Sequence, residues 1–240
     1  MSVAFGIMPF MGLDIFVGNL ADLDDDEEAI EHFGEEFAVV ARALRAAGFG
    51  DWRQPEADLS EPVEFQSWGY GGLHYLRRLA VHLTASGMLP PPGDDRAAKD
   101  PLLAEAYRRN PAHAIDIEKT ATIGSADEGR TGFDHLVQHS DAEGYYVPVD
   151  FQPVLIDERI TGTYLGSSHR LLDECLRLAR VLELPDDLDP ESDEVWEIAG
   201  GGITDSGRRW HRYGIEAFVC LRLIAAARAS IRMGAAIIFT

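Results

Sequence analysis

The densest set of reactive side chains in the sequence lies between residues 135 and 150. It contains His135, His139, Asp141 and Asp150. Imidazole nitrogens and carboxylate oxygens are common ligands of zinc and of non-haem iron. If residues 133–139 form a helix, the two histidines are four positions apart and lie on one face. The pattern predicts a Zn or Fe site, with Asp141 or Asp150 as the third ligand, in a metal-dependent hydrolase.

The same pattern has a plain structural interpretation, in which no cofactor is bound. Two histidines at this spacing arise often by chance, and Asp141 then does no more than cap a turn. Leu136 stands where the zincin helix carries its glutamate, and this disfavours a metalloprotease. The sequence leaves open whether the protein is an enzyme or has a pair of surface or interface histidines.

Carboxylates form a second candidate site, because they are strongly clustered along the chain. Residues 22–36 hold nine Asp or Glu and residues 183–197 hold eight, with no Lys or Arg in either block. The two blocks supply −17 of the formal charge of −20. The candidate binding residues in them are Asp24, Asp25, Asp26, Glu27, Glu28, Asp186, Asp187, Asp189 and Glu191.

Two interpretations of these acidic blocks are open. Acids near a helix N-terminus complement the helix dipole, so each block is explained as the solvated start of a helix. Alternatively, if the fold brings the blocks together, they form one negative surface that binds a basic protein such as a toxin domain. Complementary charge speeds association and rejects wrong partners. This second interpretation predicts an acidic binding protein of the immunity or inhibitor type.

The overall composition narrows the choice of partners and compartment. With 41 acidic against 21 basic residues, the chain has too few clustered cations to bind nucleic acid or an anionic membrane directly. The most apolar stretch, residues 215–231, is interrupted by three charged residues and does not read as a membrane span. Two cysteines in apolar patterns fit reduced thiols in a cytoplasmic protein, and 19 arginines against two lysines fit a GC-rich bacterial source.

Hydrophobic periodicity predicts the elements that position these residues. Spacing of three and four predicts helices near residues 25–47, 73–86, 102–109, 168–182 and 208–233. Short apolar or alternating runs predict strands near residues 3–8, 13–17, 144–151, 160–165 and 236–239. Regular strand–helix–strand units are absent from this order. We therefore expect an α+β fold, a mixed or antiparallel sheet packed with several helices, in a single domain over residues 1–240 with an exposed connection near residues 88–100.

Two strings in the second half of the chain resemble those of a known group of proteins. They are HSDAEGYYVPVDF at residues 139–151 and GSSHRLL at residues 166–172, followed by an alanine-rich C-terminal helix. Together they resemble a group of uncharacterised bacterial proteins over about the C-terminal half of the chain. The resemblance implies relatedness and assigns a role to no residue.

Overall fold

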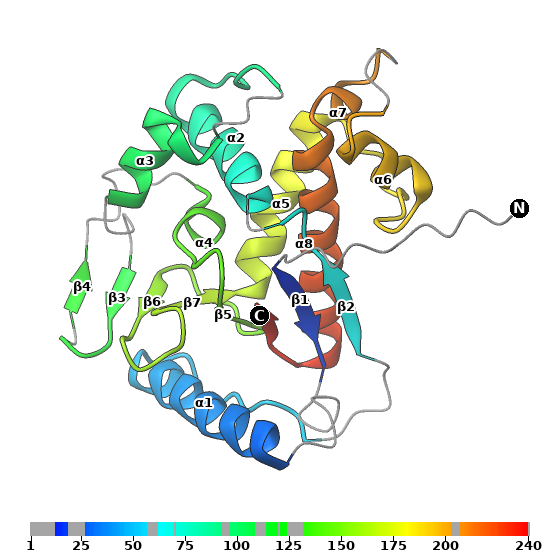
Figure 1. Cartoon of the computed structure of the whole chain (residues 1–240). Helices are drawn as coiled ribbons and strands as arrows, with labels where there is room; N and C mark the ends of the chain where they lie inside the picture. Colours follow the sequence, from blue (N-terminus) through cyan, green and yellow to red (C-terminus); the bar gives the residue numbers. More distant parts are fainter. Residues whose placement is uncertain are drawn as a thin grey trace, which may run out of the picture.

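One mixed β-sheet runs through the protein and is covered by helices on both faces (Figure 1). The computed structural model describes residues 13–18, 27–56, 62–69, 71–92, 97–108, 114–119, 121–123, 132–202 and 207–239. The strands are β1 (Asp14–Val17), β2 (Val63–Gln66), β3 (Ala114–Asp116), β4 (Ala121–Ile123), β5 (Gly144–Val147), β6 (Val154–Ile156), β7 (Tyr164–Ser167) and β8 (Ile237–Phe239). Their order across the sheet is β2-β1-β8-β5-β7-β6-β3-β4, with β3–β6 and β5–β7 parallel and the other pairs antiparallel. This confirms the α+β class.

The helices divide into two groups according to the face of the sheet that they cover. They are α1 (Glu27–Ala46), α2 (Gly72–Ser86), α3 (Pro101–Arg108), α4 (Asp134–Val137), α5 (Ser168–Leu182), α6 (Asp193–Ala199), α7 (Arg209–Arg212) and α8 (Gly214–Met233), with a 3₁₀ turn, η2 (Ala97–Lys99). Helix α1 packs Phe37, Val40 and Leu44 against one face of the sheet. Helices α2, α5, α6 and α8 build the larger core on the other face.

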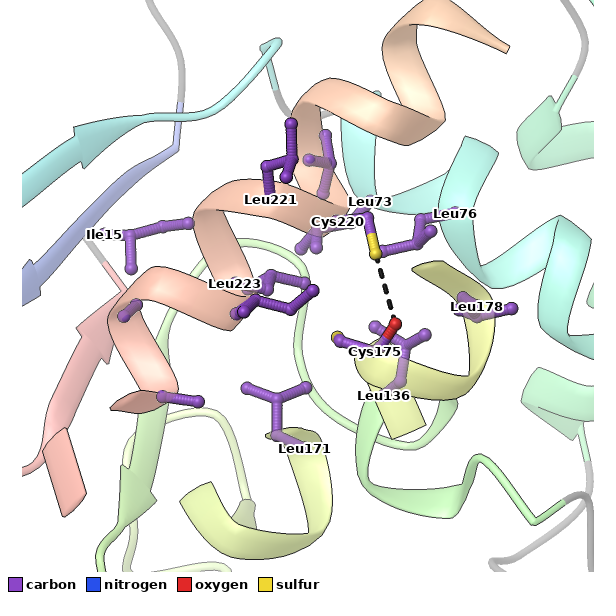
Figure 2. Packing of buried hydrophobic residues seen from close by; sticks show 14 of the residues in the cluster. Ile15, Leu73, Leu76, Leu136, Leu171, Cys175, Leu178, Cys220, Leu221 and Leu223 are labelled. Atoms are coloured by element: carbon purple, nitrogen blue, oxygen red, sulfur yellow. Dashed lines mark hydrogen bonds between the residues drawn. The ribbon is translucent and has the colours of Figure 1, made fainter. Parts of the chain in front are cut away.

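Helix α8 is the centre of the larger core. It contacts α2, α5, α6 and α7 as well as β1, β2 and β8. Its many alanines allow the close approach to α5 that Figure 2 shows, where the Cys220 thiol lies 3.3 Å from the carbonyl oxygen of Cys175. Both cysteines are buried free thiols, which behave as small apolar side chains.

The alternation predicted for residues 144–151 is confirmed within β5, which ends at Val147, four residues earlier than predicted. Tyr145 and Val147 of β5 face α1, whereas Tyr146 points into the larger core. The helix predicted over residues 208–233 is instead broken into α7 and α8. A Cβ on Gly214 would overlap the carbonyl oxygen of Ile198, so the end of α6 passes directly over the break. The strand predicted at residues 3–8 lies outside the described residues.

The segment near residues 88–100 contacts α2 before and after a gap, because residues 93–96 lie outside the described residues. Pro90 and Ala97 are buried. The carboxylate of Asp100 lies 2.9 Å from both Arg78 Nε and His82 Nε2. Within the described part of the chain, none of the helices combines the length and the apolar character needed to cross a bilayer.

Replacing Gly166 by alanine is expected to destabilise the protein by about 2 kcal/mol or more, because overpacking a core forces the neighbouring groups to shift. Gly166 lies opposite Tyr146 in the β5–β7 pair, and an added Cβ would overlap the tyrosine ring. The free energy of unfolding, measured by urea denaturation, tests this. Gly34→Ala is the control: nothing lies within 4 Å of a Cβ there, and alanine inside α1 should stabilise by about 0.5 kcal/mol. Equal effects of the two changes would contradict the packing argument.

Candidate functional site

The two histidines of the predicted metal site are buried and their ring nitrogens face the backbone. Nδ1 of His135 accepts a hydrogen bond from the Ser167 N–H at 3.0 Å, and Nε2 lies 3.0 Å from the carbonyl oxygen of Gln152. The Nε2 atom of His139 lies 3.0 Å from the carbonyl oxygen of Tyr145. Burial lowers the pKa of both rings to about 4, so both are neutral at pH 7.

The carboxylates expected beside these histidines are engaged elsewhere. Asp141 lies 3.0 Å from His74 Nε2, and Asp150 lies 2.7 Å from Arg170 Nη2. Helix α4 ends at Val137, so the two histidines do not share a helix face. Among the described residues, no group of three or more His, Cys, Asp or Glu is placed to hold a metal ion. These side chains do not fit a Zn or Fe centre. The prediction of a metal-dependent hydrolase depended on that centre and is not supported.

The second acidic block, residues 183–197, folds back onto the larger core. Its apolar residues Leu184, Leu188 and Val195 pack there, as does Ile198 directly after it. Three of its glutamates meet arginines of the C-terminal region. The pairs are Glu183–Arg209 at 2.9 Å, Glu191–Arg222 at 2.7 Å and Glu194–Arg208 at 3.0 Å. Of the three, only the Glu191–Arg222 pair involves a buried partner, and the other two pairs are exposed.

Five other acids of this block face solvent, and we call them the outward acids. They are Asp186, Asp187, Asp189, Asp193 and Glu197. None of them has an ion-pair partner among the described residues. Three of the four residues predicted as a binding site in this block are therefore outward acids, whereas the fourth, Glu191, has its carboxylate against Arg222.

Arg222 is a buried cation that appears in the sequence as an interruption of an apolar stretch. Its side chain has 0% exposure, and its guanidinium carbon lies 3.4 Å from the ring centre of Phe218 and 4.8 Å from that of Trp196. Burial lowers its pKa to about 10, so it keeps its charge at pH 7. None of its nitrogens makes a hydrogen bond of good geometry within the described residues. The Glu191 carboxylate is thus its principal electrostatic partner.

The first acidic block does not join the second in the described structure. Asp24, Asp25 and Asp26 lie outside the described residues, as do the side chains of Glu27 and Glu28 at the start of α1. Helix α1 packs on one face of the sheet, whereas α6 packs against α8, which lies on the other face (Figure 1). A single negative surface made by both blocks stays a prediction, because most acids of the first block lie outside the described residues.

A cavity of about 420 Å³ lies beside α5, and the sequence analysis missed it. Its lining includes Arg170, Arg177, Arg180 and Glu174 of α5. The Glu174 carboxylate accepts hydrogen bonds from the N–H groups of His135 and Leu136, at 3.1 and 2.7 Å. Burial raises the pKa of Glu174 to about 8. The sequence does carry a sign of this site. The three arginines are spaced by seven and then three residues, which places them on one side of a helix.

The stability of the protein is expected to fall by about 1 kcal/mol between pH 7 and pH 8, because folded Glu174 still binds a proton that the unfolded chain lost near pH 4.5. His135 and His139 act in the opposite sense, but only between about pH 4 and their usual pKa of 6.5. Urea denaturation at several pH values measures the slope. Glu174→Gln should reduce the slope to the smaller fall that comes from Glu216, whose pKa burial raises to about 7. Glu31→Gln, an exposed change on α1, should leave the slope unchanged, and a wild-type stability that rises over this interval would refute the assignment.

Removing Glu191 is expected to destabilise the protein by about 2 kcal/mol, because Arg222 is left buried without its carboxylate. In an Arg222→Met background the loss from Glu191→Ala should drop below about 0.5 kcal/mol, since methionine needs no counter-charge. A double-mutant cycle by denaturation measures the coupling. Asp187→Ala, which removes an outward acid, serves as the control and should change stability little. Additive losses from the two changes would show that the pair is not coupled.

Comparison with known proteins places the chain in a family. Neither the search of curated proteins nor the search of solved structures gave a match. A family model described as "Putative DNA-mimic protein" matches residues 11–239, well beyond the C-terminal half to which the resemblance from sequence strings extended. The match also overturns the toxin domain expected as a partner, because a mimic of DNA is directed at proteins that bind DNA. The chain belongs to this DNA-mimic family.

Proposed function

We propose that this protein binds a DNA-binding protein at the surface that the partner uses for DNA, with the outward acids in the place of phosphates. One observation carries the proposal. Residues 183–197 present five solvent-facing carboxylates on a segment that is held to the core by the pair of Glu191 with the buried Arg222 and by the packing of Leu184, Leu188 and Val195. The charge that faces solvent is therefore both dense and fixed in position.

Fixed charges matter because duplex DNA is stiff and its phosphates recur regularly, with one charge per about 3.4 Å along each strand. Asp193 and Glu197 are four residues apart on α6 and so are neighbours on the helix surface, with Cβ atoms about 5–6 Å apart. A segment already ordered before binding loses little conformational entropy when it docks. The anchoring of this segment thus favours binding by the acids that remain outside.

The chemistry of a DNA-binding surface suits carboxylates as well as phosphates. Arginine forms two parallel hydrogen bonds with either group, and lysine attracts both as a point charge. A formal charge of −20 also attracts a basic surface over a long range and repels DNA itself. The protein and DNA would then compete for one surface. The composition suggested an inhibitor, and the proposed inhibitor acts by preventing its partner from binding DNA.

The decisive experiment is competition for a partner that is known to bind DNA. Proteins of the source organism that bind a duplex-DNA column are passed over the immobilised chain, and one that is retained is purified. Its complex with a fluorescent 30-base-pair duplex is then titrated with the chain. We expect loss of fluorescence anisotropy as the duplex is displaced. A partner that holds the chain and the duplex at the same time would refute the proposal.

Neutralising three outward acids is expected to weaken this competition about tenfold, since an exposed ion pair contributes about 0.5 kcal/mol. The variant is Asp186→Asn, Asp187→Asn and Asp189→Asn. The amide oxygen introduced at position 189 can still accept the hydrogen bond that the Glu191 N–H donates there. The matched control changes three exposed glutamates elsewhere to glutamine: Glu56, Glu143 and Glu158. Equal weakening by the two triple variants would show that only net charge matters.

A further inference from the structure

We propose that the cavity beside α5 binds a small ligand that carries a phosphate or a carboxylate group, through Arg177 and Arg180. Its volume of about 420 Å³ lies in the range of small-molecule sites. The cavity collects three arginines on a chain that otherwise has a large excess of acids. The inference goes beyond the proposed DNA mimicry and does not depend on it.

The arginines face the cavity because the other side of α5 is occupied by the core. Leu171, Cys175, Leu178 and Leu182 of this helix are fully buried, and Figure 2 shows three of them in the apolar cluster. Side chains three and seven residues apart share one side of a helix. The polar side of α5 therefore forms one wall of the cavity along two or three turns.

The three arginines have different roles in this wall. Arg170 is held by Asp150 at 2.7 Å, so it shapes the wall. The guanidinium of Arg177 lies 4.3 Å from the ring centre of Phe133, a stacking contact that fixes the plane of its hydrogen-bonding fork. Arg180 is exposed and has no ion-pair partner among the described residues. Arg177 and Arg180 are thus the groups available to an oxyanion.

Glu174 does not compete for these arginines. Both of its oxygens accept backbone N–H groups, from His135 and Leu136. With its pKa raised to about 8 by burial, it is mostly uncharged at pH 7. The inner end of the cavity therefore repels an anion far less than an ionised carboxylate would.

A further carboxylate on α5 bears on the rest of the ligand. Asp173 also lines the cavity, and one of its oxygens lies 3.8 Å from Arg170 Nη1. Carboxylates accept hydrogen bonds and do not donate them, so they suit a ligand whose body carries hydroxyl groups. The lining thus favours a hydroxylated molecule with one anionic end, such as a sugar phosphate or a sugar acid.

Titration calorimetry with ribose 5-phosphate, gluconate and ribose, at matched ionic strength, tests the site. We expect saturable binding of at least one of the two anions with a dissociation constant below about 1 mM, and much weaker binding of ribose. Tighter binding of ribose 5-phosphate identifies a phosphate ligand, and tighter binding of gluconate identifies a carboxylate ligand. No saturable heat for either anion up to about 10 mM, or ribose binding as tight as that of the anions, would overturn the proposal.

The variant Arg177→Gln with Arg180→Gln should weaken anion binding at least about tenfold, because charge-assisted hydrogen bonds are lost. The matched control is Arg42→Gln with Arg45→Gln, which removes the same charge from exposed positions on α1. Equal weakening in the control would show a general charge effect and refute the site. Should the double variant fold poorly, Arg180→Glu alone, at an exposed position, gives the same comparison.

Discussion

Arg222 brings a positive charge into the core of a protein whose formal charge is −20. Taking a guanidinium out of water is costly, and the cost is offset only by close partners. The aromatic rings of Phe218 and Trp196 cover it, and the Glu191 carboxylate lies 2.7 Å away. Because Trp196 and Glu191 both belong to residues 183–197, balancing this charge requires that segment to fold back over α8. The buried charge of Arg222 therefore helps to determine where the outward acids lie.

The carboxylates of residues 183–197 repel one another. Eight acids within residues 183–197 disfavour a compact arrangement. Three arginines of the C-terminal region neutralise three of them, and burial of Leu184, Leu188 and Val195 adds apolar contact with the core. What remains is an ordered segment whose five uncompensated acids are exposed to solvent. A disordered run of equal charge would lose far more entropy on binding.

Hydrophobic periodicity predicted the helices and strands that bury one side along their own length. The apolar stripes of α1, α2 and α5 and the alternation of β5 are visible in sequence because each element buries one side. Strands β3, β4 and β6 have three residues each, and they exist only through pairing with other strands. The burial of His135 and His139 depends on contacts with Ser167 and Tyr145 that spacing does not reveal. For the same reason, the sequence identifies the second acidic block but not its packing against α8.

Helix α5 carries the arginines of the cavity, and the outward acids follow its C-terminal end. Its arginines line the cavity as far as Arg180, and the helix ends at Leu182. Glu183 then adopts a left-handed conformation with a φ of 61°, and the Leu184 N–H donates to the carbonyl oxygen of Ala179 at 2.9 Å. Glycine usually occupies this position because a side chain there costs about 1 kcal/mol. The left-handed residue ends the helix, so the acids that follow leave the line of the α5 arginines, and the Glu183 carboxylate lies 2.9 Å from Arg209.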